Sequence, residues 1–193
     1  MELTQLRSYC EQQDIPLISQ ATEDFLRKHI AQYTPHRIIE VGSAVGYSSS
    51  VIAEAMYQHS PGDPSLSLMS REISYPHYRQ ALQTLKQRHY HFVYYFLGHI
   101  NRYPLERYII QPYDMLFIDG RKSETLDYLR QLTHSIHPLT TIIIDDVIKF
   151  EVKMHETYDY LATHHIAYTI LPLDSDDGVM LIHGKDRLRG SDE

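Results

Sequence analysis

Three aspartates and one lysine have the types and spacing that most directly suggest chemistry. Asp119 follows the apolar run 115–118, and Asp145 and Asp146 follow the apolar run 142–144. Asp145 or Asp146 alone would more often cap the segment after it, but three acids together offer a set of oxygen ligands. Such a set is typical of Mg²⁺ or Ca²⁺ rather than zinc, and without a cation its members would repel one another. We therefore predict a metal site at these three residues.

Lys122 lies three residues after Asp119, so one turn of helix could bring its amine over the same site. Most lysines are simply solvated surface residues. A lysine beside carboxylates and a metal, however, can act as a general base or position a hydroxyl group. We predict that Lys122 and Asp119 are catalytic.

The segment from Glu40 to Ser48 has the pattern of a strand that enters a glycine turn and leaves as a helix. Gly42 lets the backbone turn sharply and lets a ligand approach closely, and the helix that follows offers free N–H groups. The segment has neither the GxGxxG pattern of dinucleotide-binding folds nor a GxxxxGK phosphate loop. Glu40 would repel a pyrophosphate, so the turn suits a ligand with a cationic group.

Glu72 follows the second predicted strand. An acid at this place can accept hydrogen bonds from both hydroxyls of a ribose. The plainer interpretation is a solvated loop carboxylate, but the strand context favours ribose binding.

The elements that must position these residues alternate along the chain. Helices are predicted for residues 2–13, 19–33, 47–58, 76–89, 123–135 and 151–165, and strands for residues 37–41, 66–70, 92–97, 113–118, 141–144, 167–171 and 179–182. This alternation predicts an α/β fold with a doubly wound, mostly parallel sheet. The last two strands are joined without a helix, which favours an antiparallel pair at one edge. Ligands bind at the carboxyl ends of the strands in such sheets, where the candidate residues lie.

The composition excludes several other classes. The chain has 193 residues, 42% of them hydrophobic, and a formal net charge of −7. It is therefore no general binder of polyanions, although a local basic patch would be compatible with that charge. Its apolar runs fall far short of the ~20 residues of a membrane span. The polar start is unlike a signal peptide, and there is a single cysteine, Cys10. We expect a cytoplasmic protein with no membrane contact.

Taken together, the motifs resemble those of a known enzyme family. EVGSAVGYSS resembles the first motif of class I S-adenosylmethionine-dependent methyltransferases. FIDGRK at 117–122 and IIIDDV at 142–147 resemble the metal-dependent O-methyltransferases of the caffeoyl-CoA and catechol type, and the similarity covers most of the chain. The resemblance implies one Rossmann-like methyltransferase domain over residues 1–193, with N-terminal helices in 1–35, a core of seven strands in 36–185 and a tail in 186–193.

The resemblance also implies roles for the matching residues. The methionine end of S-adenosylmethionine would lie by Glu40, Gly42, Ser43 and Ser48, the ribose by Glu72, and the adenine by Gly98, His99 and Ile100. Asp119 would border the cofactor and, with Asp145 and Asp146, hold a divalent cation (Mg²⁺, with Mn²⁺ or Ca²⁺ as alternatives), and Lys122 would be the catalytic lysine. Two departures stand out: the family usually has Asp-Asn where this chain has Asp145-Asp146, and often Gly-Asp-Ala where this chain has Gly98-His99-Ile100.

The methyl acceptor stays open between two classes. The short, acidic chain favours a small catechol-like or other hydroxylated aromatic substrate. Short bacterial relatives that methylate the 5-hydroxyl of wobble uridine in tRNA are also similar, including the segment 15–17, and tRNA would suit the local bases Arg27, Lys28, Arg102, Arg107 and Arg121. Two further classes of protein, an NAD-dependent oxidoreductase and a non-catalytic partner subunit, could share this fold. Glu40 counts against the first, and the intact acids with Lys122 count against the second. We expect a homodimer.

Overall fold

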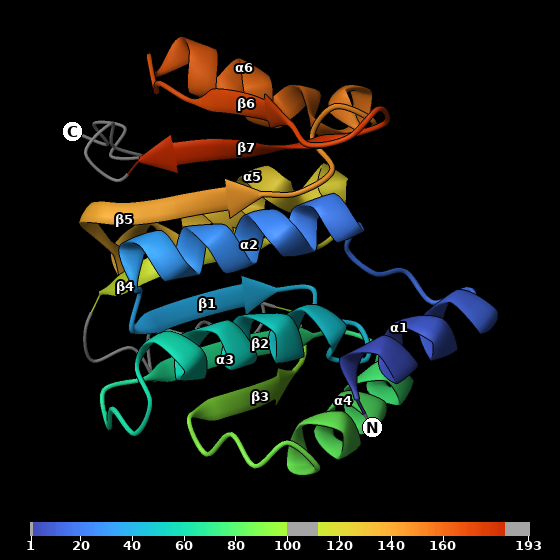
Figure 1. The fold of residues 1–193 in the computed structure, drawn as a ribbon. Helices are drawn as coiled ribbons and strands as arrows, with labels where there is room; N and C mark the ends of the chain where they lie inside the picture. The colour runs from blue at the N-terminus through green and yellow to red at the C-terminus, as the bar shows by residue number, and fades with distance from the viewer. Residues whose placement is uncertain (1, 100–111, 184–193) are drawn as a thin grey trace.

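The computed structural model describes residues 2–99 and 112–183, which form a central sheet between two layers of helices (Figure 1). The strands are β1 (Arg37–Val41), β2 (Ser67–Glu72), β3 (Val93–Leu97), β4 (Tyr113–Ile118), β5 (Ile136–Ile144), β6 (Thr169–Pro172) and β7 (Gly178–His183). Their order in the sheet is β3-β2-β1-β4-β5-β7-β6. The first five strands are mutually parallel, and β7 runs antiparallel to both β5 and β6. This confirms the predicted mostly parallel sheet with its antiparallel edge pair.

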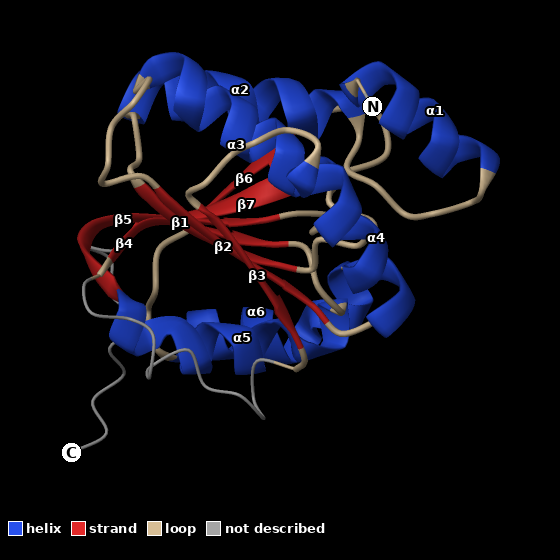
Figure 2. Cartoon of the chain, turned by 90° about the horizontal axis from the view of Figure 1, so that it is seen from below, coloured by secondary structure: helices blue, strands red, loops and turns tan. Residues whose placement is uncertain are grey.

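The helices cover both faces of the sheet, with α2 and α3 on one face and α5 and α6 on the other (Figure 2). Their bounds are α1 (Leu3–Gln12), α2 (Gln20–Tyr33), α3 (Tyr47–His59), α4 (Tyr75–Lys86), α5 (Thr125–Leu132) and α6 (His155–Thr163), with short 3-10 turns η2 (Lys122–Glu124), η3 (Thr133–Ser135) and η4 (Glu151–Met154). Ser19 caps α2, because its hydroxyl oxygen accepts a hydrogen bond from the Thr22 N–H at 3.0 Å. The described residues form no helix long and apolar enough to cross a membrane.

Three elements differ most from their predicted bounds. The helix predicted for 151–165 begins as the 3-10 turn η4 and is α-helical only from His155 to Thr163. β5 begins at Ile136 rather than at residue 141, because Ile136 pairs with Tyr113 across a register shift in the β4–β5 ladder. The helix predicted for 123–135 is α-helical only in its middle, since 3-10 turns flank it on both sides.

Side chains alternate between the two faces of the sheet, as strand geometry requires. Ile39 packs under α5 and α6, whereas its neighbour Ile38 packs under α2 and α3. In register, Val41 pairs with Ile118, and Ile118 pairs with Ile144. The residues that follow these three strand ends therefore leave the sheet side by side, which sets up a shared site.

Candidate active site

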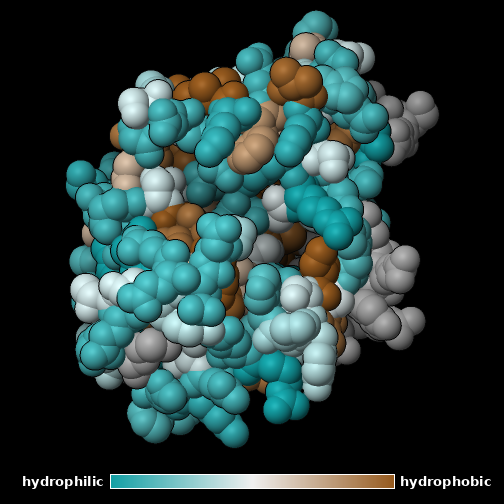
Figure 3. Space-filling model, turned by 90° about the vertical axis from the view of Figure 1, so that its right-hand side faces the viewer, coloured by the Kyte–Doolittle hydropathy of each residue, from teal (hydrophilic) through white to brown (hydrophobic). Residues whose placement is uncertain are grey.

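A pocket of about 480 Å³ opens at the carboxyl ends of β1, β2, β4 and β5. Figure 3 looks onto this edge of the sheet, a largely hydrophilic face with a hollow near its middle. The lining has two parts. The glycine-turn half includes Gly42, Ala44, Arg71, Glu72, Gly98 and His99, and the acid–lysine half includes Asp119, Lys122, Asp145, Asp146, Phe150 and Lys153.

Gly42 brings the end of β1 against the end of β4. Its φ of +89° lies in the left-handed region, and a Cβ here would stand 2.3 Å from the Asp119 carbonyl oxygen. Only glycine fits such a close approach. The N–H groups of Gly42 and Ser43 both donate to the Arg71 carbonyl oxygen, at 3.0 and 3.2 Å. The close approach at Gly42 is therefore to the end of the neighbouring strand. The approach of a ligand to this turn stays a prediction.

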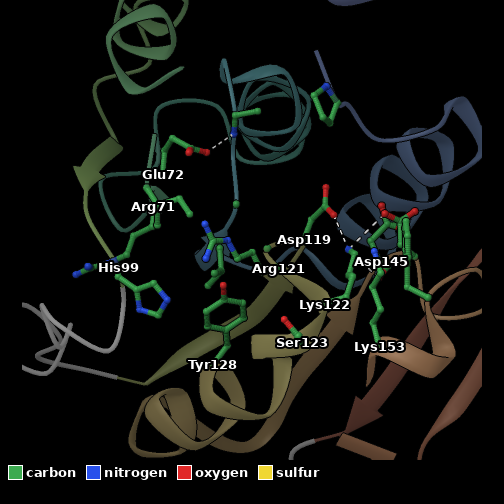
Figure 4. Close-up of a pocket in the computed structure, with 18 of the residues that line it drawn as sticks. Arg71, Glu72, His99, Asp119, Arg121, Lys122, Ser123, Tyr128, Asp145 and Lys153 are labelled. Carbon is green, nitrogen blue, oxygen red and sulfur yellow. Dashed lines mark hydrogen bonds and ion pairs between the residues drawn. The ribbon is translucent and has the colours of Figure 1, made fainter. Parts of the chain in front are cut away.

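Glu72 fastens the glycine turn to the end of β2. Its Oε2 accepts a hydrogen bond from the Ala44 N–H at 2.8 Å, and its Oε1 accepts one from the Ser74 N–H at 2.6 Å. Figure 4 shows the Glu72 carboxylate directed at the turn. Each carboxylate oxygen has a further lone pair, so Glu72 can still accept hydrogen bonds from a ligand.

Lys122 lies at the centre of the acid–lysine half (Figure 4). Its Nζ donates to Asp119 Oδ1 at 2.8 Å and to the Asp145 carbonyl oxygen at 3.1 Å, and it lies 3.4 Å from Asp146 Oδ2. The Asp145 carboxylate instead accepts a hydrogen bond from the Thr22 hydroxyl of α2 at 3.1 Å. The predicted meeting of the three aspartates with the lysine is thus present at this edge of the sheet.

The charges in this half shift one another's pKa values. Burial alone would lower the pKa of the Lys122 amine, but the negative charges of Asp119 and Asp146 outweigh it, and the net shift is upward. Burial raises the pKa of the Asp145 carboxyl, and the charges of Asp119 and Asp146 raise it further. Lys122 is therefore an ammonium at neutral pH, which favours a positioning and charge-stabilising role over that of a general base.

The predicted metal site does not fit this arrangement. Within residues 2–99 and 112–183, no three His, Cys, Asp or Glu side chains are gathered so that they could hold a metal ion. The Lys122 ammonium lies between Asp119 and Asp146 and supplies the positive charge that a cation was expected to supply. The three acids follow neighbouring strand ends, as the sequence predicted, but the sequence did not show that Lys122 would pair with two of them.

Three residues predicted to hold the cofactor lie outside the pocket lining: Glu40, Ser43 and Ser48. Glu40 is fully buried and accepts hydrogen bonds from the hydroxyls of Ser49 and Ser70. Burial raises its pKa to about 7, although the serine hydroxyls oppose the shift. The Ser43 hydroxyl donates to the Arg71 carbonyl oxygen at 3.1 Å. Glu40 and Ser43 thus support the glycine turn from within the protein.

The far end of the glycine-turn half is formed by Gly98 and His99, while Ile100 lies outside the described residues. The Gly98 N–H donates to the Glu72 carbonyl oxygen at 2.9 Å, which continues the β2–β3 pairing. His99 Nε2 lies 2.7 Å from Glu124 Oε2, the same oxygen to which the Tyr128 hydroxyl donates at 2.7 Å. This network links the end of β3 to η2 and α5.

A family model described as a methyltransferase domain matches residues 39–147, more than half of the chain. The chain belongs to this methyltransferase family. Among solved structures, the O-methyltransferase of Bacillus cereus in complex with SAH is 20% identical, with a TM-score of 0.80 over 94% of this chain and 90% of that one. TomG, an O-methyltransferase of Streptomyces achromogenes solved with SAM, is 18% identical, with a TM-score of 0.76 over 94% and 88%. The SAH-bound methyltransferase PaMTH1 of Podospora anserina is 14% identical, with a TM-score of 0.74 over 86% and 80%.

Several pocket residues of this methyltransferase were not singled out by the sequence. Arg71 immediately precedes Glu72, and its guanidinium lies 5.8 Å from the centre of the Phe96 ring. The Tyr128 ring leaves room only for glycine at position 120, because a Cβ at Gly120 would stand 2.6 Å from the ring. Phe150 and Lys153 come from the segment after β5. No motif marks these residues, so only the fold brings them to the pocket.

Proposed function

We propose that this methyltransferase transfers a methyl group from S-adenosylmethionine to a hydroxyl oxygen of a small hydroxylated aromatic compound. One observation carries the proposal: the Lys122 ammonium is held between Asp119 and Asp146, opposite a glycine turn fastened by Glu72. The first arrangement suits a developing oxyanion, and the second suits a nucleoside. The fold shared with SAM- and SAH-bound methyltransferases agrees with this choice of cofactor.

The glycine-turn half would hold the cofactor. Glu72 has lone pairs available for the ribose hydroxyls, and Gly98 with His99 would border the adenine. Gly42 would lie beside the methionine end, where a small residue permits close approach. The pocket volume of about 480 Å³ is within the usual range for small-molecule sites, roughly 300–1,000 Å³.

The acid–lysine half would prepare the acceptor. When bound, S-adenosylmethionine supplies an electrophilic methyl group and leaves as the neutral thioether. The acceptor hydroxyl loses its proton to a carboxylate, for which Asp119 is better placed than Asp145, since the Asp119 side chain is partly exposed and Asp145 is buried. The Lys122 ammonium donates a hydrogen bond to the developing oxyanion, and the oxygen then forms the new bond to the methyl carbon. Electrostatic stabilisation of this kind is worth about 10²–10³ in turnover.

The proposed reaction uses no metal ion, because the Lys122 ammonium already pairs with Asp119 and Asp146. Of the bases that would favour tRNA as acceptor, Arg27 is ion-paired with both Glu23 and Glu54 at 3.0 and 2.7 Å. Arg102 and Arg107 lie outside the described residues. We propose the small aromatic acceptor because the pocket volume of about 480 Å³ suits a small molecule. Methylation of tRNA is the alternative outcome of the test.

The test uses methyl-labelled S-adenosylmethionine with a set of aromatic diols and with hypomodified tRNA, followed by mass spectrometry. We expect label on a diol oxygen and none on tRNA. Glu72→Gln should weaken cofactor binding by about 10-fold to 100-fold, because a carboxylate is the stronger acceptor. Its turnover at saturating cofactor should change little. The matched control is Glu156→Gln, which removes an exposed acid of α6. Label only on tRNA, or equal cofactor affinity for both variants, would overturn the proposal.

A further inference from the structure

The acid–lysine half is bordered by the segment 147–154, between β5 and α6. Phe150 and Lys153 of this segment line the pocket, whereas Lys149 does not belong to the lining. The Lys153 Nζ lies 4.8 Å from the centre of the Phe150 ring, and the Lys149 Nζ lies 5.7 Å from it. A cation over a ring at this distance is attracted to it, which holds the Lys153 amine at the pocket. Figure 4 shows Lys153 extending toward the pocket from this side.

Lys153 and Lys122 have different electrostatic surroundings. Lys122 is neutralised by Asp119 and Asp146, at 2.8 and 3.4 Å. Lys153 takes part in none of the ion pairs found within the described ranges, and its side chain is exposed. Arg121 also borders the pocket, but it pairs with Glu124 at 3.2 Å. Lys153 is thus a cation of the pocket lining that forms no ion pair with a carboxylate of the described residues.

Three apolar residues of the same pocket lining are suited to contact an aromatic ring. Pro16 and Leu17, from the connection between α1 and α2, line the same pocket as Phe150. These three supply apolar contact, and Lys153 supplies three N–H donors and a positive charge. An aromatic acceptor with an acidic substituent would satisfy both parts at once.

We infer that the methyl acceptor carries a carboxylate, which Lys153 binds while Pro16, Leu17 and Phe150 contact the ring. This inference rests on the proposed function, because it concerns the acceptor of that same reaction. A single lysine suits one small anionic group, whereas nucleic acid is held by several cations together. Lys153 is a specificity residue. It raises the affinity for the acceptor, whereas Lys122 and Asp119 act on the oxygen that is methylated.

The test compares 3,4-dihydroxybenzoate with the neutral 3,4-dihydroxybenzamide, under saturating S-adenosylmethionine. The wild type should favour the acid by about tenfold, mainly through a lower KM, as expected for one charge-assisted contact. Lys153→Gln should reduce the acid-to-amide ratio of kcat/KM to near unity, and Lys153→Arg should retain most of the preference. Taking the ratio in each variant cancels the different acidities of the two diols. Lys149→Gln is the matched control, because it removes a lysine from the same ring outside the pocket lining.

Each result separates this inference from the proposed function. Methylation of both diols with the same ratio in the wild type and in Lys153→Gln would overturn the role of Lys153 and leave the O-methyltransferase function standing. Methylation of neither diol, together with label on tRNA, would overturn both. An equal loss of preference in Lys149→Gln would also overturn the inference, since the effect would then come from general surface charge.

Discussion

The two halves of the pocket hold their carboxylates in different ways. In the glycine-turn half, Glu72 is held by two neutral backbone N–H groups. In the acid–lysine half, Asp119 and Asp146 are held by the positive charge of Lys122. Backbone donors are fixed by the turn itself, so the first half is set by local chain geometry. The second half depends on a balance of charges, so the removal of one charge alters every partner.

The difference follows from which segments meet. Glu72 and Ala44 come from strand ends whose pairing is fixed by the β1–β2 ladder, where Val41 pairs with Arg71. The acid–lysine half gathers residues from β4, η2 and β5, and Thr22 of α2 binds one of its acids. The buried charged groups among these residues must neutralise one another, because an unpaired charge in low-dielectric surroundings is costly.

The largest effect should follow from Lys122→Met, which removes the only charge that answers Asp119 and Asp146 among the residues the structure describes. We expect turnover to fall by about 10²–10³, with cofactor affinity close to that of the wild type. The free energy of unfolding should fall by about 2 kcal/mol, less than for a fully buried pair, because the Asp146 side chain is 39% exposed. Turnover under saturating cofactor, calorimetric cofactor binding and urea unfolding measure the three effects.

Lys122→Arg is the control that keeps the charge. It should retain more turnover than Lys122→Met, although its planar fork fits the three acceptors less well. If Lys122→Met keeps more than about a third of wild-type turnover, the acid–lysine half does not work through charge, and the contrast between the halves fails.

The sequence predicts the local features of the site better than the contacts between distant segments. The strand ends at Gly42, Glu72 and Asp119 follow from alternating apolar runs, and parallel strands place such ends at one edge of the sheet. Whether a cation or Lys122 would neutralise the acids depends on the path of η2, which no motif encodes. Phe150 and Lys153 carry no motif either.

One departure could have been found from the sequence. Side chains alternate along a strand, so Glu40 shares a face with Ile38, which packs under α2 and α3. Because Glu40 is two residues after Ile38, its side chain is expected on the face covered by α3, near the serines of that helix and away from the pocket. The glycine motif therefore predicted the turn correctly, whereas strand periodicity predicts the direction of the Glu40 side chain better than the motif does.

The next largest effect concerns Glu40, the buried acid that supports the glycine turn and whose hydrogen-bond partners are neutral serine hydroxyls. Its pKa is raised to about 7 by burial, so between pH 4.5 and 7 the folded protein binds a proton that the unfolded chain releases. Folding stability should therefore decrease as pH rises through this window. Glu40→Gln has no such charge, and between about pH 5 and pH 8 it should lose roughly 2–3 kcal/mol less stability than the wild type.

Urea unfolding of both proteins at the two pH values measures this difference, and all other titrating groups cancel in the comparison. Glu156→Gln, with its exposed acid, should follow the wild type at both pH values. Parallel pH profiles for Glu40→Gln and the wild type would show that Glu40 stays charged without cost. The two halves would then not differ in how they tolerate an acid.

The smallest effect should come from a chelator. Because Lys122 lies between Asp119 and Asp146, EDTA should change wild-type turnover by less than about twofold. In Lys122→Met the same acids lose their ammonium, and oxygen ligands with uncompensated charge attract divalent cations. Mg²⁺ or Mn²⁺ should therefore raise the residual turnover of Lys122→Met several-fold, and EDTA should reverse the gain. Wild-type activity that is lost in EDTA and restored by Mg²⁺ would mean that the acids bind a cation in preference to Lys122. The acid–lysine half would then be organised by a bound metal ion and not by the charge of Lys122.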